Sequence, residues 1–291
     1  SHGSVLSPLV WGYTAKLARA IQERWPGKTL VSSFYSRWAD GPGDIKLPKN
    51  VTFMIVETRE AYLKEPVYWD RVTHDLSEKM ALAGAPVPLW SHYPHRPRIS
   101  NRMDAPYLVP HVLKKYAQWL RGRSSGVFLN GHGTSSFALD GVVTYLYHKL
   151  MWNPDLDVDA MLAEYCQIMF GPAGPDVSTY YQTIIKRWEG RKWENLTEEE
   201  VRNPHGEIKW SRYYQDAYPR EVRMALKALL KAAERKTAEG TVYQARTHWL
   251  ARGTQPFFIQ GELLDGGEIV IGECTRFSPD IDGALSDWEG H

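Results

Sequence analysis

The feature that most constrains the fold of this chain is the alternation of helix-like and strand-like segments through residues 1–150. Apolar residues recur at helical spacing from Val10 to Trp25, between a favourable start at Ser7-Pro8 and a stop at Pro26-Gly27. Units of this kind, repeating every 20 to 40 residues or so, predict parallel β/α architecture. Further helices are expected at 67–83, 107–121 and about 140–150, and β-prone runs separate them at 29–36, 50–58, 86–93 and 126–130.

Each expected strand ends in a cluster of polar or aromatic residues. The clusters are Tyr35, Glu57–Arg59, Trp90–Tyr93 and Asn130–His132. In a (β/α)8 barrel, the carboxyl ends of the strands form the active-site face. Four strands preceded by a helix therefore predict the rear half of a TIM-type barrel, formed by residues 5–150.

Beyond Leu150 the pattern is helical alone. Helices are expected at 157–170, 177–189, 220–239 and 242–250, around a polar segment at 193–218 that is rich in Trp and Tyr. Residues 151–265 are thus predicted to form a C-terminal α-helical domain. Residues 266–291 are interpreted as a linker, with a short β-like run at 268–273.

Composition narrows the class of partner. The net charge is +1, from 35 basic and 34 acidic side chains without a basic block, which argues against nucleic acid. The apolar runs are too short for a membrane span, and no signal-peptide pattern is visible. The opening Ser1-His2-Gly3-Ser4 is interpreted as a cloning remnant. Of the two cysteines, Cys166 and Cys274, the first is expected to be a buried free thiol.

Aromatic residues are numerous, with 12 Trp and 16 Tyr. Their flat apolar faces and polar edges suit stacking on sugar rings, so the excess favours a carbohydrate ligand. Any single one of these side chains is more readily explained as a core or helix-packing residue.

Three stretches resemble one bacterial family. They are WGYTAKLARAIQERWPGK with VSSFYS, then KLPKNVTFMIVETR, then YLYHKLMWNPDLDVDAMLAEYCQIMFGPAG. They are similar to the domain-of-unknown-function 4838 proteins, to which glycoside hydrolase family 163 belongs, over about residues 5–260. In the tail, Ile281-Asp282-Gly283 with Ser286-Asp287-Trp288 is similar to the opening of family 9-like carbohydrate-binding modules.

The first resemblance implies a secreted or periplasmic endo-β-N-acetylglucosaminidase that acts on N-glycans. The implied mechanism is substrate-assisted, an exception to the usual two-carboxylate arrangement. The acetamido oxygen of the sugar attacks the anomeric carbon, while an adjacent Asp-Glu pair steers it and protonates the leaving oxygen. This sequence contains no Asp-Glu pair, and its expected position is upstream of Ser4. The chain alone is therefore predicted to be inactive.

Glu57 and Tyr93 are the predicted catalytic residues. Glu57 would grip sugar hydroxyls or tune a neighbouring acid, and its alternative is an ion pair with Arg59. Tyr93 would donate its hydroxyl to the acetamido carbonyl, where charge develops, and its alternative is a rim tyrosine packed over a loop.

The predicted substrate-binding residues occupy the other strand ends. Trp90 alternates with Leu89, so one of the two faces the barrel interior, where Trp90 would stack under a sugar ring. Hydroxyl contacts are expected from the remaining positions, Tyr35, Arg59, His92, Asn130 and His132. His92, His95 and His132 could form a metal site, but the sequence has no histidine pair at i, i+4 spacing and no Cys cluster to support one. No metal or other cofactor is therefore predicted.

Two other readings stay open. The chain can be a non-catalytic carbohydrate-binding protein on a degenerate barrel, or a helical interaction scaffold, which suits residues 150–260 but leaves the strand ends unexplained. A half barrel would also leave strands 29–36 and 126–130 as open edges. Self-association through that side, or a separate N-terminal piece, is the expected consequence.

Overall fold

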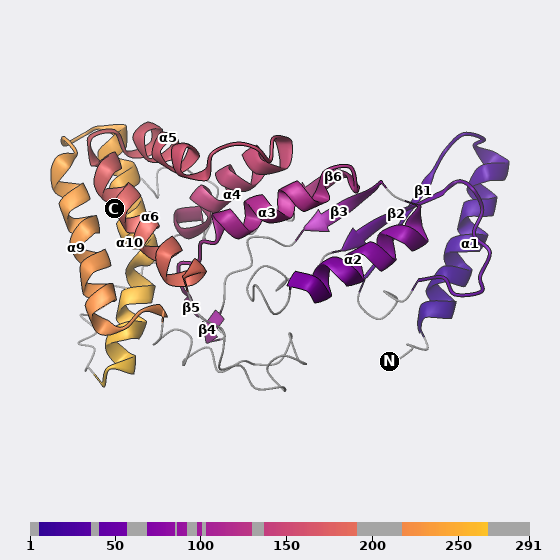
Figure 1. Cartoon of the computed structure of the whole chain (residues 1–291), viewed down its shortest axis with the longest axis horizontal. Coiled ribbons are helices and arrows are strands. Elements are labelled where there is room, and N and C mark those ends of the chain that lie inside the picture. Colours follow the sequence, from indigo (N-terminus) through magenta and orange to yellow (C-terminus); the bar gives the residue numbers. More distant parts are fainter. Residues whose placement is uncertain are drawn as a thin grey trace, which may run out of the picture.

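The computed structural model describes residues 6–35, 41–56, 69–84, 86–91, 98–100, 103–129, 137–190 and 217–266. The molecule is elongated (Figure 1). Helix α1 (Leu6–Arg24) lies at one end and a parallel sheet follows it. At the other end lie α6 (Gly174–Glu189), α9 (Arg220–Lys236) and α10 (Val242–Leu264).

In the described residues, the sheet has four parallel strands that follow one another in chain order. They are β1 (Leu30–Phe34), β2 (Val51–Val56), β3 (Val87–Ser91) and β6 (Ser124–Leu129). A doubly wound sheet would reverse direction at a switch point, and this order does not. The prediction of a parallel α/β fold is confirmed, and β1 and β6 are the two outer strands of the sheet, as expected.

Helices connect most of these strands. Helix α2 (Trp69–Ala83) stands between β2 and β3, and α3 (Pro110–Leu120) precedes β6. The described part of the β1–β2 connection, residues 41–50, consists of turns and coil. A short antiparallel pair, β4 (Arg98–Ser100) and β5 (Met103–Asp104), was not expected from the sequence.

One face of the sheet is covered by helices, and we call it the covered face. Phe34, Ile55 and Leu89 are fully buried there. The Trp11 ring of α1 lies 5.3 Å from Phe34 and 5.8 Å from Phe53, centroid to centroid. Side chains of α2 and α3 join the same core, so α1, α2 and α3 bury one side of the sheet: Leu76, Met80, Leu113, Tyr116 and Leu120.

The C-terminal region is a packed group of helices. It contains α4 (Phe137–Trp152), α5 (Val158–Phe170) and the 3-10 turn η3 (Gly171–Ala173), followed by α6, α9 and α10. Asp157 caps α5 by accepting a hydrogen bond from the Ala160 amide at 2.8 Å. Cys166 on α5 is a buried free thiol, as predicted.

Helix α10 continues past its predicted end at Leu250. Gly253 and Pro256, whose residue types are unfavourable in helix interiors, both lie inside this helix. A Cβ at Gly253 would lie 2.2 Å from the Cβ of Ala138, so glycine lets α10 approach α4 closely. Tertiary packing here overrides local propensity.

The two regions meet around the segment before α3. The Trp188 indole donates to the Pro106 carbonyl at 3.0 Å and stacks edge-on against Tyr107 at 4.8 Å. The Tyr218 hydroxyl donates to the same carbonyl. These buried contacts join α6 and the start of α9 to the strand-bearing half.

None of the described helices is long and apolar enough to cross a membrane.

Candidate functional site

The second face of the sheet, which we call the open face, carries Val31, Met54, Val56, Trp90 and Phe128. Register partners in a parallel sheet point to the same side, and successive residues to opposite sides. Val56 pairs with Trp90, and Trp90 pairs with Phe128. Their neighbours Ile55, Leu89 and Val127 belong to the covered face.

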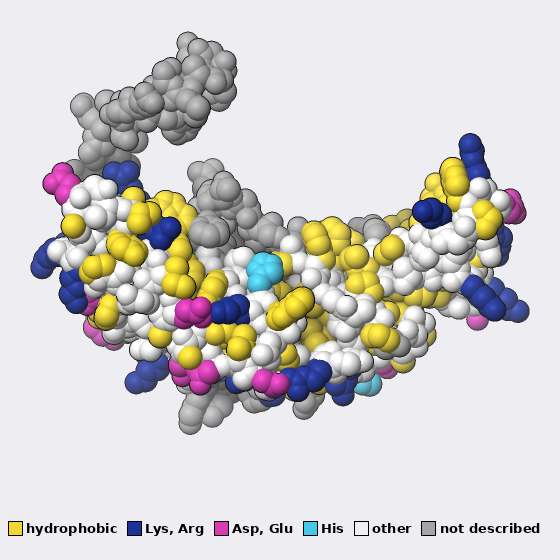
Figure 2. All heavy atoms as spheres, turned by 90° about the horizontal axis from the view of Figure 1, so that it is seen from above, with side chains coloured by type: hydrophobic (Ala, Val, Ile, Leu, Met, Phe, Trp, Pro, Cys, Tyr) yellow, Lys and Arg dark blue, Asp and Glu magenta, His cyan; other side chains and the backbone are white. Residues whose placement is uncertain are grey.

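Two residues of the open face are strongly exposed. Val31 is 54% exposed and Phe128 is 51% exposed, although both are strand residues with large apolar side chains. The five open-face side chains are absent from the core that the helices form with the covered face. In the space-filling view, apolar side chains are visible over the middle of the molecule, and charged ones concentrate toward its ends and lower edge (Figure 2).

At the carboxyl ends of the strands, the open face presents a row of four side chains, three of which are aromatic. Trp90 and Phe128 lie in adjacent strands with centroids 4.6 Å apart and planes tilted by 58°. Val56 is the register partner of Trp90 on the other side. Tyr35, 39% exposed, follows Phe34 directly and so stands next to Val56 in the row. With strands spaced by about 4.8 Å, the row is about 14 Å long.

This aromatic row (Tyr35, Val56, Trp90 and Phe128) has the chemical properties needed to stack against a sugar ring. Aromatic rings offer flat apolar surfaces, and sugar rings have apolar faces with a polar rim. A row longer than one sugar ring can hold more than one ring of an oligosaccharide. The position also matches the edge of the sheet where parallel β/α folds carry their sites.

The outer surface of α1 is apolar as well. Leu9, Tyr13 and Leu17 recur every four residues and are 69%, 67% and 36% exposed. Residues at this spacing share one face of a helix. Trp11 and Ala15, between them in the sequence, are buried against the sheet. Helix α1 therefore has two apolar faces, and the described residues cover one of them.

A family model with the description "Domain of unknown function (DUF4838)" matches residues 1–182. The chain belongs to this family. The match extends from α1 into α6 and includes the whole sheet with its aromatic row. Helices α9 and α10 lie beyond it. No curated protein and no solved structure matches the chain.

Within the DUF4838 region, the structure describes two of the predicted site residues. Tyr35 and Trp90 are part of the same row on the open face. The predicted catalytic residues Glu57 and Tyr93 lie outside the described residues, so their roles stay predictions. The same holds for Arg59, His92, His95, Asn130 and His132.

Sequence reasoning did not single out Phe128 and Val56. Phe128 lies inside the run GVFLN, which the sequence indicates only as a strand. Its register with Trp90 places it on the open face. Alternation with the buried-side residues Val127 and Leu129 was the available signal.

Among the described residues, the groups whose pKa values are shifted lie at or beyond His111 in the sequence. Burial raises the pKa of the Cys166 thiol to about 12, which excludes this thiol as a ready nucleophile. Among the described residues, no group of three His, Cys, Asp or Glu side chains is arranged to hold a metal ion.

Proposed function

We propose that this chain is part of a glycoside hydrolase that acts on N-acetylhexosamine-containing glycans, in the manner of an endo-β-N-acetylglucosaminidase. The observation that carries the proposal is the aromatic row at the carboxyl ends of β1, β2, β3 and β6. Stacking on Trp90 and Phe128 holds a sugar ring at the edge of the sheet where Glu57 and Tyr93 follow in the sequence. The enzyme is proposed to work outside the cytoplasm.

The proposed chemistry is substrate-assisted. The acetamido oxygen attacks the anomeric carbon, and the leaving oxygen takes a proton from an Asp-Glu pair that this chain does not contain. Tyr93 donates its hydroxyl to the acetamido group, and Glu57 holds sugar hydroxyls.

The proposed fold is the rear half of a (β/α)8 barrel. Four parallel strands in chain order, with helices on one face, support it. The apolar open face supports it too, because the interior of a barrel is filled by side chains from all of its strands. Further strands would pair with β1 and β6, and a further helix would cover Leu9, Tyr13 and Leu17 on α1.

Titration with N,N′-diacetylchitobiose, followed by calorimetry, tests the binding surface. Trp90→Ala and Phe128→Ala are each expected to weaken binding by about five- to tenfold, the usual worth of one stacked ring. Trp152→Ala is the matched control, because Trp152 is 92% exposed at the end of α4, away from the row. Equal loss in all three variants, or in none, would refute the aromatic row as the sugar site.

Turnover tests the chemistry separately. The chain alone is expected to release no chromophore from a chromogenic N-acetylglucosaminide, since a general acid typically supplies about 10²–10⁴-fold in rate. Turnover at ordinary enzyme rates would mean that the acid lies within this chain.

The second candidate function is a non-catalytic carbohydrate-binding protein on a degenerate barrel. The aromatic side chains of the row support it too, because stacking on a sugar ring needs no catalytic group. A protein that contains this chain and also the Asp-Glu pair, yet binds chitobiose without cleaving it, would establish this alternative.

A further inference from the structure

A groove of about 680 Å³ runs between α9 and α10, outside the DUF4838 match. Its volume lies within the range of small-molecule sites. The two helices are antiparallel across it: Lys227 contacts Glu262 at one end, and Glu234 contacts His248 at the other. Ten residues line it: Lys227, Leu230, Lys231, Glu234, Ala251, Arg252, Gln255, Phe258, Ile259 and Glu262.

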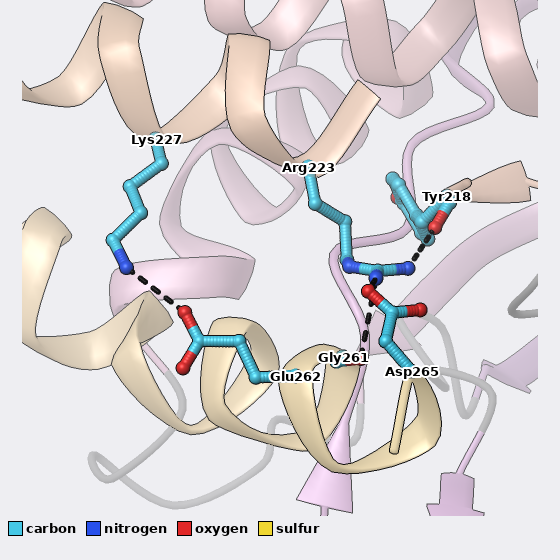
Figure 3. Close-up of polar contacts among 6 residues, drawn as sticks. All are labelled: Tyr218, Arg223, Lys227, Gly261, Glu262 and Asp265. Carbon is cyan, nitrogen blue, oxygen red and sulfur yellow. Dashed lines mark hydrogen bonds and ion pairs between the residues drawn. The ribbon is translucent and has the colours of Figure 1, made fainter. Parts of the chain in front are cut away.

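The carboxylates of the groove already have polar partners. Glu262 accepts a hydrogen bond from the Lys227 ammonium at 3.1 Å, which Figure 3 shows spanning from α9 to α10. Glu234 lies 3.8 Å from the His248 ring. Lys227 therefore neutralises Glu262, and the three cations that line the groove outnumber its two carboxylates.

Two other cations of the groove have no ionic partner in the described part of the chain. Lys231 on α9 and Arg252 on α10 lie on opposite walls, between the two contacts just described. Neither has an ion-pair or hydrogen-bond partner for its side chain in the described part of the chain. The groove thus offers two uncompensated positive charges to a ligand, one from each wall.

Between these cations the floor is apolar. Leu230 is 3% exposed and Phe258 is 7% exposed, with Ile259 beside them, and Gln255 adds an amide on the α10 wall. Cations on both walls, an amide and an apolar floor suit a ligand that joins an anionic group to a ring with apolar faces and hydroxyl edges.

We propose that the groove binds an acidic sugar, with its carboxylate between Lys231 and Arg252 and its ring over Leu230 and Phe258. The choice of a sugar as the carrier rests on the proposed function, whereas the anionic group follows from the charges of the groove alone. The site selects the acidic units of a glycan at a distance from the aromatic row on the sheet.

The test is titration of the full chain with glucuronate at low salt, followed by NMR and calorimetry. Amide shifts are expected along α9 and α10. The double variant Lys231→Gln, Arg252→Gln is expected to weaken binding at least tenfold, and rising salt is expected to weaken binding to the wild type. Arg235→Gln is the matched control, an exposed cation on α9 that does not line the groove, and it is expected to stay within twofold.

Two further probes decide what the groove recognises. N-acetylglucosamine, which is neutral, and benzoate, a carboxylate without a sugar ring, are both expected to bind more weakly than glucuronate. Equal binding of N-acetylglucosamine, or unchanged glucuronate binding by the double variant, would overturn the anionic site. Equal binding of benzoate would overturn the sugar as its ligand. Neither result affects the conclusion from the chitobiose titration, which tests Trp90 and Phe128.

Discussion

The helical region and the sheet region bury their apolar side chains in different ways. In the helical region, helices cover one another on several sides, and residues such as Leu162, Ile184 and Leu226 are fully buried. In the sheet region, α1, α2 and α3 cover one face, and the other face exposes Val31 and Phe128 by more than half. Among the described residues, one region has a closed core, and the other has a core on one side of its sheet only.

The difference bears on both function and stability. A core residue of the helical region contributes fully to the free energy of unfolding, because its surroundings are complete. Val31 and Phe128 contribute less than fully buried residues of the same size, because about half of each side chain stays in contact with water. This exposed apolar surface could pack against further strands or a sugar ring.

The largest effect is expected in the closed core. Leu226→Ala on α9 should lower the free energy of unfolding by about 2–5 kcal/mol, because it removes fully buried methyl groups and leaves a cavity. Met224→Ala on the same helix, where the side chain is 56% exposed, should change it by less than about 0.5 kcal/mol. Urea unfolding followed by circular dichroism measures both. Similar losses in the two variants would contradict a closed core around α9.

An intermediate effect is expected where α9 and α10 are tied together. Arg223, 5% exposed, donates to the carbonyl oxygens of Tyr218 and Gly261 and to the carboxylate of Asp265 (Figure 3). Asp265→Asn removes the negative partner of a buried cation and should cost about 1–3 kcal/mol in thermal or urea unfolding. Glu262→Gln breaks the neighbouring exposed pair with Lys227 and should cost about 0.5 kcal/mol or less. The reverse order would show that the buried contact does not hold the two helices.

A smaller, pH-dependent effect is expected at the junction of the regions. His111 at the start of α3 hydrogen-bonds through Nδ1 to Glu189 at 2.7 Å, and its backbone N–H donates to the same carboxylate at 2.8 Å. This hydrogen bond raises the pKa of His111, with support from the charges of Glu189 and Asp159 and opposition from burial and Lys114.

Because the folded-state pKa of His111 lies above its unfolded value, the stabilisation is complete below about pH 6.5 and is lost as the pH rises through the folded pKa. The half-exposed ring limits this contribution to about 0.5 kcal/mol. Unfolding free energies measured from pH 5.5 to 8.5 should fall with rising pH in the wild type more than in His111→Gln. Parallel curves would remove His111 as the cause.

The smallest effect on stability is expected on the open face. Phe128→Ser should change the free energy of unfolding by about 0.5 kcal/mol or less, because the ring is half exposed in the described chain. The same variant should reduce association between copies, measured by sedimentation at several concentrations, because it removes an apolar group from an exposed surface. A loss of several kcal/mol would show that Phe128 is part of a filled core.

The sequence was sufficient for the parallel strands, because each is a short apolar run bounded by turn residues. It was insufficient where long-range packing decides. The expected helix ends at Leu250, whereas α10 continues through Gly253 and Pro256 and packs closely against Ala138 at Gly253. Strands β4 and β5 are too short to produce a recognisable alternation of apolar and polar residues in the sequence.

The sequence predicted part of the candidate site and left the rest open. Tyr35 and Trp90 were found because they stand at strand ends. The alternation of Leu89 with Trp90 left open which of them faces the helices, since both are large and apolar. The register answers this: Leu89 is buried on the covered face, and Trp90 packs against Phe128 on the open face, with the two rings tilted.

The central claim is that the open face of the sheet is an incomplete core. Light scattering combined with intact-mass analysis tests it most directly. The account predicts association of the chain above its 33.3 kDa mass, or a companion fragment that stays bound to it, and Val31→Arg with Phe128→Arg should abolish either one. A monodisperse 33.3 kDa monomer without a companion would contradict the claim, because the open face would then be stable in water as it stands.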